Sequence, residues 1–433
     1  MNGLVPLGPA PASAAGSRPA APVDPRVWPD VARLPRASAV RTAVARRLVG
    51  RALAGLPLHV AAPDGSVAGR GGPVLRLHDP AAFHRRIGAD GLIGFGESYM
   101  AGEWDADDLV AVLTVLAGHL TELVPPGLQR LRTLWAHRRP RAQANSPQGA
   151  RQNIHRHYDL SNDLFALFLD ETMTYSSAVF RELPSRADDL ATAQQHKIDL
   201  LLDLAAVGQG TRLLEIGTGW GELALRAARR GARVRTVTLS REQRDLAAAR
   251  IAAAGLSERV EVELRDYRQL HGSYDAVVSV EMIEAVGAEY WPAYFAALAR
   301  LLAPGGRVAL QSITMAHDRM LATRDTHTWI GKYVFPGGII PSTTAIIAAA
   351  QASGLRAESA TGFGEHYAET LRLWRERFTA GADTGEVAAL GFDHVFRRMW
   401  EFYLAYCEAG FRAGYLDVHR FTLTASGPAG GAR

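Results

Sequence analysis

The pattern of apolar and polar residues alternates between two periods from about residue 197 onward. Short apolar runs of strand-like composition lie at residues 212–217, 233–240, 260–266, 274–282 and 306–314. Stretches with helical spacing lie between them, such as REQRDLAAARIAAAG and YWPAYFAALARLLAPGG. Alternation at this spacing predicts an α/β domain with a parallel, doubly wound sheet.

The first 150 residues have a different pattern. Residues 37–56, ASAVRTAVARRLVGRALAGL, have helical spacing, with valines and leucines on one side and arginines elsewhere. This is typical of a membrane-surface helix and equally of an amphipathic helix packed on its own domain. Two short strands are predicted next, in LPLHVAAPDGSVAG and GPVLRLHDP, with Asp64 and Gly65 forming a turn. We therefore expect a smaller α+β domain ahead of the sheet.

Composition suggests where the domains begin and end. Residues 1–30 are rich in Pro, Ala, Gly and Ser, which predicts a disordered leader, and they lack the pattern of a secretory signal. Residues 136–152, AHRRPRAQANSPQGARQ, are basic and poor in apolar residues, which predicts a linker. We thus expect an N-terminal domain at 31–135, the sheet domain at 153–425 and a disordered tail at 426–433.

The overall composition narrows the class of protein. With 433 residues the chain is long enough for two domains, and no run approaches 18 consecutive apolar residues. A single cysteine, Cys407, excludes an intrachain disulfide and a cysteine-based zinc site, and we expect no metal site. These features favour a cytoplasmic protein.

Charge is unevenly distributed along the chain. Residues 1–150 hold 17 Arg and no Lys against 11 acidic residues, while the remainder is close to neutral. A basic N-terminal third favours an anionic partner, either nucleic acid or a phospholipid surface. A general preference for arginine in the composition is the alternative explanation.

A glycine-rich turn, TRLLEIGTGWGELALRAA at residues 211–228, follows the first strand of the sheet. A phosphate-binding P-loop is excluded because no Lys-Ser or Lys-Thr pair follows the turn. A dinucleotide site would need its third glycine one residue later. This departure weakens a dinucleotide site without excluding it. S-adenosylmethionine is the third candidate, because it carries no phosphate and its ammonium group suits a carboxylate such as Glu215. Gly217, Gly219 and Gly221 are the predicted turn.

The end of the second strand departs from a common pattern. Many nucleotide-binding sheets place an acidic residue there to hold the ribose hydroxyls. Here the strand ends in TVTLS, so neutral groups would have to hold the ribose.

Four further stretches carry a more specific resemblance. They are HRHYDLSNDLFALFLDETMTYSSAVF (155–180), VTLSREQ (237–243), VSVEMIEAVG (278–287) and KYVFPGGIIPS (332–342). Together they resemble the cyclopropane-fatty-acyl-phospholipid synthase family, which includes the mycolic acid methyltransferases. GFGESYMAGEWDADDL (94–109) is similar to the N-terminal domain of the full-length synthases. The whole chain is most similar to an actinobacterial branch that makes 10-methylene and then 10-methyl (tuberculostearic-type) chains.

This resemblance implies a Rossmann-like S-adenosylmethionine-dependent methyltransferase domain and a role for each cofactor position. The positions are Tyr175 and Ser176 at the methionine end, Thr238, Leu239 and Gln243 at the ribose, and Asp266 and Tyr267 at the adenine. It also implies that Tyr158 lines an acyl pocket.

The resemblance further implies a bound bicarbonate ion as the catalytic base. The positions that match its ligands are Ser177, Glu284, Gln311, Ile313 and Tyr367. Ser177 and Gln311 replace the more common Cys and His, and EAVG replaces Glu-His-Val-Gly. Ser and Gln can still donate hydrogen bonds to an anion, although neutral Gln adds no positive charge. Glu284 is the first catalytic candidate.

The chemistry suits these residues. An alkene that attacks a sulfonium methyl group leaves a carbocation, which needs a water-poor pocket, aromatic faces and a base. Loss of a proton directly closes a cyclopropane, whereas a hydride shift before proton loss gives a methylene group, which we favour. The expected substrate is an oleoyl-type phospholipid chain at the inner face of the membrane. A homodimer and a separate reductase are the other partners that the resemblance implies.

Two other functions stay open. The arginine-rich third allows a methyltransferase of a soluble small molecule, although the absence of Asn-Pro-Pro-Tyr-type motifs speaks against nucleic acid. Gln311 and Ala285 would also suit a lipid-binding homologue that has lost catalysis. The aromatic run at residues 396–416, with Cys407 as a small apolar residue, predicts a core helix.

Overall fold

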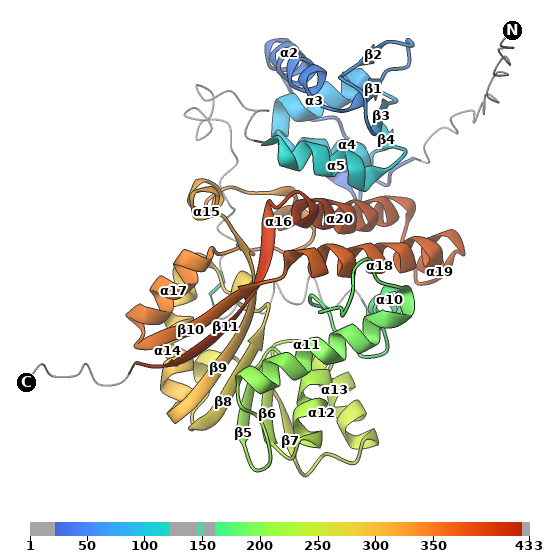
Figure 1. Ribbon diagram of the computed structural model, residues 1–433. Helices are drawn as coiled ribbons and strands as arrows, with labels where there is room; N and C mark the ends of the chain where they lie inside the picture. The colour runs from blue at the N-terminus through green and yellow to red at the C-terminus, as the bar shows by residue number, and fades with distance from the viewer. Residues whose placement is uncertain (1–21, 121–139, 141–144, 147–148, 150–160, 427–433) are drawn as a thin grey trace, which may run out of the picture.

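A computed structural model describes residues 22–120, 140, 145–146, 149 and 161–426. Most of the predicted linker (136–152) lies outside the described residues, as do Tyr158, residues 1–21 of the predicted leader and residues 427–433 of the predicted tail. The described residues form two sheets, one on each side of the predicted linker. Figure 1 shows the smaller sheet and its helices at one end of the molecule.

The larger sheet has seven strands in the order β10-β11-β9-β8-β5-β6-β7. Five of them run parallel, while β11 is antiparallel to β9 and β10 is antiparallel to β11. The strands are β5 (Arg212–Ile216), β6 (Arg233–Thr238), β7 (Val260–Leu264), β8 (Tyr274–Val280), β9 (Leu302–Met315), β10 (Leu355–Gly362) and β11 (Leu416–Ala425). The parallel strands confirm the five predicted ones and the doubly wound α/β class.

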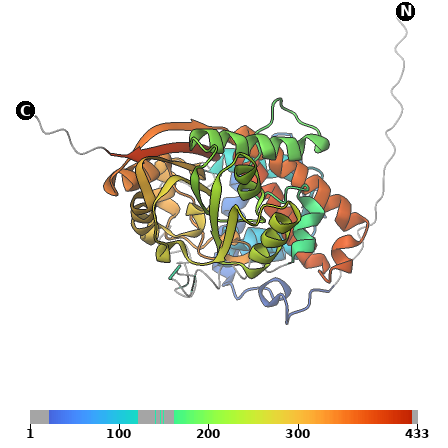
Figure 2. The same cartoon turned by 90° about the horizontal axis from the view of Figure 1, so that it is seen from below.

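The two faces of the sheet are covered because consecutive residues of a strand point to opposite faces. Leu213 belongs to a buried cluster with side chains of α11 (Leu190–Leu204), α12 (Glu222–Arg229) and α13 (Arg241–Ala253). Leu214, next in the chain, belongs to a second cluster with side chains of α14 (Trp291–Leu301) and α17 (Thr343–Ala352). Figure 2 shows the sheet edge-on between these helices.

Two long helices, α18 (Gly364–Asp383) and α20 (His394–Arg412), lie across one end of the sheet. The aromatic run predicted as a core helix forms α20, which ends at Arg412, so that Leu416 already belongs to β11. Helix α20 packs against α18 and also against two helices from the N-terminal part of the chain, α4 (Leu92–Met100) and α5 (Leu109–Gly118).

The N-terminal unit is defined here as the elements from α1 to α5. It contains a four-stranded sheet in the order β2-β1-β3-β4, and Gly65 turns the chain between β1 and β2 with a positive φ of 81°. Its elements are α1 (Pro29–Ala32), α2 (Ala39–Gly55), β1 (His59–Ala61), β2 (Val67–Ala68), β3 (Val74–Leu77), α3 (Pro80–Asp90), α4 (Leu92–Met100), β4 (Trp104–Ala106) and α5 (Leu109–Gly118). The predicted helix, strands and turn are all present.

Polar contacts fix the N-terminal unit to α20 and its neighbours. Arg398 on α20 donates to the Tyr99 carbonyl (2.6 Å) and to the Asp105 carboxylate (2.8 Å). Lys332 donates to the buried Glu97 carboxylate at 2.6 Å. The apolar cluster is also continuous between the two parts, since it includes Trp104 and Phe402. The N-terminal unit is therefore packed tightly against α20 of the larger domain.

The predicted leader is wrong at its C-terminal end. Residues 24–28 form a turn, and Pro29 begins α1. The Trp28 indole donates to the Asp393 carboxylate at 2.8 Å. An aromatic residue with a distant hydrogen-bond partner orders this segment despite its proline-rich composition.

Candidate active site

The glycine turn joins β5 to α12 and requires three left-handed backbone positions. Gly217, Gly219 and Gly221 have φ values of 99°, 52° and 90°. A Cβ on Gly217 would lie 2.7 Å from Met282 Cγ, and one on Gly221 would lie 3.1 Å from Ala247 Cβ. A Cβ on Gly219 would meet no described atom within 4 Å and would project into open space. The turn is thus built to leave room above Gly219.

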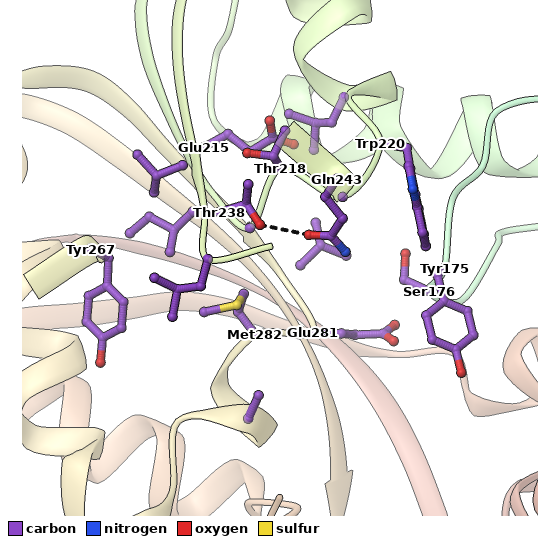
Figure 3. A pocket seen from close by; sticks show the side chains of 18 of the residues that line it. Tyr175, Ser176, Glu215, Thr218, Trp220, Thr238, Gln243, Tyr267, Glu281 and Met282 are labelled. Atoms are coloured by element: carbon purple, nitrogen blue, oxygen red, sulfur yellow. Dashed lines mark hydrogen bonds between the residues drawn. The ribbon is translucent and has the colours of Figure 1, made fainter. Parts of the chain in front are cut away.

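A cavity of about 160 Å³ lies over this turn. Ten of the eleven predicted cofactor positions line it, and Figure 3 shows several of their side chains around one space. The ten are Tyr175, Ser176, Glu215, Gly217, Gly219, Thr238, Leu239, Gln243, Asp266 and Tyr267. Gly221 packs against α13 instead.

Glu215 lies at the floor of the cavity, near the end of β5. Its carboxylate accepts a hydrogen bond from Thr236 Oγ1 at 2.6 Å. Burial raises the pKa of Glu215 to about 8, and the nearby Lys197 ammonium opposes that shift. An ammonium group entering the cavity would compensate the buried charge, as expected for the amino-acid end of the cofactor.

The strand ends of β6 and β7 supply the polar groups for a nucleoside. Thr238 Oγ1 donates to Gln243 Oε1 at 2.8 Å (Figure 3), so among the described residues the Gln243 amide nitrogen stays available to a ribose. Asp266 is held by the guanidinium of Arg268 at 2.6 Å. The Tyr267 hydroxyl is buried without a partner among the described residues.

Three of the five predicted catalytic residues converge on a carboxylate that the sequence analysis did not assign. Glu281 Oε1 accepts hydrogen bonds from the Ser177 backbone N–H at 3.0 Å and from Gln311 Nε2 at 2.9 Å. Glu281 Oε2 accepts one from the Tyr367 hydroxyl at 2.7 Å. The Ser177 hydroxyl donates elsewhere, to the Ala178 carbonyl. Glu281 also lines the cavity (Figure 3).

The other two predicted catalytic residues pair with each other. Glu284 Oε1 accepts hydrogen bonds from the Ile313 backbone N–H and from Ser312 Oγ, the latter at 2.9 Å. Glu284 Oε2 is buried without a partner among the described residues. Burial and the charge of Glu281 raise the pKa of Glu284 to about 8. Glu281 accepts three hydrogen bonds and Glu284 two, so the donors favour the ionised form more strongly at Glu281.

The bicarbonate ion implied by the resemblance does not fit this arrangement. Its expected donors, Ser177, Gln311 and Tyr367, already bind the Glu281 carboxylate. An added anion would have to lie beside the Glu281 carboxylate, and two negative charges in close contact repel each other. The residues around the glycine turn, in contrast, do fit S-adenosylmethionine, which would supply an electrophilic methyl group.

Among the charged residues of the site that sequence reasoning missed, Glu281 and Lys197 are buried beside predicted positions. Glu281 stands three residues before Glu284 in EMIEAVG, and this second carboxylate was the available signal. Lys197 lies on α11, is buried, and donates to Ser176 Oγ at 2.7 Å. Its position in the helical stretch AQQHKIDLLLD gives no local sign of a role.

Comparisons with known proteins identify the chain's relatives. A family model described as mycolic acid cyclopropane synthetase matches residues 145–421. The tuberculostearic acid methyltransferase UfaA1 of Mycobacterium tuberculosis is 58% identical over 420 residues, covering 95% of this chain and 98% of the relative. The cyclopropane-fatty-acyl-phospholipid synthase of Escherichia coli is 35% identical, covering 78% of this chain and 84% of the relative.

A solved structure agrees with the sequence relatives. The mycolic acid cyclopropane synthase CmaA1, complexed with SAH and CTAB, has a TM-score of 0.58 and 34% identity. The match covers 63% of this chain and 97% of CmaA1. The chain therefore belongs to the mycolic acid cyclopropane synthetase family of S-adenosylmethionine-dependent methyltransferases.

Proposed function

We propose that this enzyme transfers the methyl group of S-adenosylmethionine to the cis double bond of unsaturated phospholipid acyl chains. The observation that carries the proposal is the hydrogen-bonded carboxylate of Glu281, which lines the cofactor cavity among aromatic side chains. The Tyr175 and Tyr403 hydroxyls are 2.6 Å apart, and the Tyr367 ring lies 4.6 Å from that of Phe411. Aromatic faces and buried surroundings suit a hydrocarbon that becomes cationic.

We propose the 10-methylene chain as the product, with cyclopropane as the alternative. The names of the relatives support an unsaturated acyl substrate, and the similarity to a tuberculostearic acid methyltransferase over 95% of this chain favours methylene. Gln311, which would also suit a degraded homologue, has a role here because its amide holds Glu281.

Acyl-chain mass spectrometry after incubation with S-adenosylmethionine and an oleoyl phospholipid tests the function. We expect a gain of one CH₂, and derivatisation that locates double bonds should find a terminal methylene carbon. A product chain that has gained the CH₂ but contains no double bond to derivatise would be a cyclopropane. No gain in mass, with the cofactor still bound, would support the lipid-binding alternative, and methylation of soluble molecules alone would support the other.

We propose that α2 docks the protein on the inner face of the membrane. Its Val40 and Val44 side chains are 72% and 46% exposed, and Arg46, Arg47 and Arg51 are exposed beside them. Exposed valines among arginines suit an anionic lipid surface. No helix within the described ranges is long and apolar enough to span a bilayer.

Co-sedimentation with vesicles tests this docking. We expect binding to vesicles containing phosphatidylglycerol and much weaker binding to pure phosphatidylcholine. Replacing the three arginines with Glu should abolish the preference for phosphatidylglycerol vesicles. Equal binding of the wild type and this variant to those vesicles would refute the proposal.

Two partners remain part of the proposal. A methylene product is still an alkene, so we propose a separate reductase that converts it to the methyl-branched chain. Analytical ultracentrifugation tests the homodimer that the family resemblance implies.

A further inference from the structure

Glu281 has a backbone conformation that is unfavourable for its residue type. It follows the last residue of β8, and its φ is 50°. This left-handed region favours glycine, and other residues adopt it mainly where the surrounding structure enforces it at functional sites. The Glu281 N–H is fixed by the Gln311 carbonyl at 2.8 Å, so backbone and side chain are both held by β9.

The oxygens of the Glu281 carboxylate have different environments. Oε1 accepts two hydrogen bonds, from the Ser177 N–H and from Gln311. Oε2 accepts one, from the Tyr367 hydroxyl, and thus keeps more lone-pair capacity than Oε1. Figure 3 shows the carboxylate extending towards Tyr175 and Ser176, the residues expected at the methionine end of the cofactor.

The electrostatic surroundings suit a base. Burial raises the pKa of Glu281, which increases its affinity for a proton, while Tyr367, Gln311, Ser177 and the charge of Lys197 oppose this shift and stabilise the ionised form. The hydrogen-bond donors thus favour the ionised carboxylate, which is the form that can accept a proton.

We propose that the Glu281 carboxylate is the general base of this enzyme, in the place where the family resemblance implies bicarbonate. This inference rests on the proposed methylation of an alkene chain. The π electrons of the double bond form the new bond to the methyl carbon, and the methyl–sulfur bond breaks with its electron pair remaining on sulfur. The acyl chain then carries the positive charge on the neighbouring carbon.

A hydride shift moves that charge to the methyl-bearing carbon. Glu281 Oε2 then takes a proton from the new methyl group, and the C–H electron pair becomes the double bond of the methylene group. Glu281 is left as a neutral carboxylic acid, which returns its proton to solvent after the product leaves. Since the carboxylate is tethered at both backbone and side chain, its position selects which proton is removed.

Three variants test the proposal in buffers freed of carbon dioxide. Wild-type turnover should be the same with and without added bicarbonate. Glu281→Gln, which keeps the size of the side chain but replaces one accepting oxygen with a donating NH₂ group, should lower kcat at least 10³-fold and change the affinity for S-adenosylhomocysteine by less than threefold. Glu281→Gly should be equally slow, and formate or bicarbonate should restore its turnover at least tenfold. The exposed Glu289→Gln is the matched control and should keep full activity.

Binding of ¹³C-bicarbonate, followed by NMR line broadening, separates this inference from the proposed function. Glu281→Gly should bind the ion and the wild type should not. Any of three results would overturn the role of Glu281. They are bicarbonate-dependent turnover of the wild type, more than 10% activity in Glu281→Gln, and equal bicarbonate binding by the wild type and Glu281→Gly. If the wild type methylates no lipid, the proposed function fails and the binding comparison still decides whether Glu281 fills the anion site. If Glu281→Gly does not fold, the wild type and Glu281→Gln decide alone.

Discussion

Replacing Gly219 with Ala should have two separate effects, one on the stability of the fold and one on the affinity for the cofactor. Gly219 has a φ of 52°, and its added Cβ would meet no described protein atom within 4 Å. An L-residue in this conformation costs about 1–2 kcal/mol, of which a Gly→Ala change regains about 0.4–1 kcal/mol by restricting the unfolded chain. The net loss of stability should therefore be about 1 kcal/mol.

The new methyl group would instead occupy the cofactor cavity. Overfilling a packed site costs about 1–3 kcal/mol, which corresponds to roughly a 10- to 100-fold weaker affinity for S-adenosylhomocysteine. Gly210 provides a matched control, since it has a φ of 77°, has no described atom within 4 Å of an added Cβ, and does not line the cavity.

Isothermal titration calorimetry and urea unfolding measure the two effects. Gly219→Ala and Gly210→Ala should lose similar stability, while Gly219→Ala alone should lose affinity. The assignment of the open space above Gly219 to the cofactor would be refuted if Gly219→Ala kept its affinity for S-adenosylhomocysteine. It would also be refuted if Gly210→Ala lost as much affinity as Gly219→Ala.

Three further predictions follow from other contacts. In urea unfolding without bicarbonate, Glu281→Gly should be about 1 kcal/mol more stable than Glu281→Ala. Both variants lack the carboxylate, and only Ala is strained by a φ of 50°. Equal stability of the two variants would contradict backbone strain at this position. The pKa of Glu284 is raised to about 8, so the unfolded state binds fewer protons between pH 4.5 and 8 and stability falls there as pH rises, by up to about 1.4 kcal/mol per pH unit. Glu284→Gln should reduce this slope in urea unfolding at pH 5–8, and a slope identical to the wild type would count against the shift. Arg398→Ala should loosen the N-terminal unit and speed its release in limited proteolysis, whereas Arg397→Ala, which loses a bond to the exposed Asp383, should not.

The cofactor half of the site could be predicted from sequence because its signals are local. A glycine turn directly after a strand, and polar residues directly after the next two strands, meet at one edge of a parallel sheet. Ten predicted positions accordingly line one cavity.

The catalytic half depends on contacts between distant elements. Glu281 meets Ser177, Gln311 and Tyr367 across 104, 30 and 86 residues of sequence. Neither the spacing of EMIEAVG nor any periodicity indicates that the first of its two carboxylates, rather than the second, receives these donors.

Two strands of the larger sheet were missed for a different reason. β10 is exposed over most of its length and contains few large apolar residues, so it lacks the apolar run of a central strand. β11 lies between β9 and β10, but it begins immediately after the aromatic helix, whose pattern obscures the start of the strand.

A base that is part of the polypeptide is present at one equivalent per active site in every molecule made. Its occupancy does not vary with the supply of dissolved inorganic carbon or with the hydration of carbon dioxide. An enzyme with Glu281 in this position would modify lipids at a rate independent of respiration and aeration, so that control would fall to the availability of methyl donor and unsaturated chain.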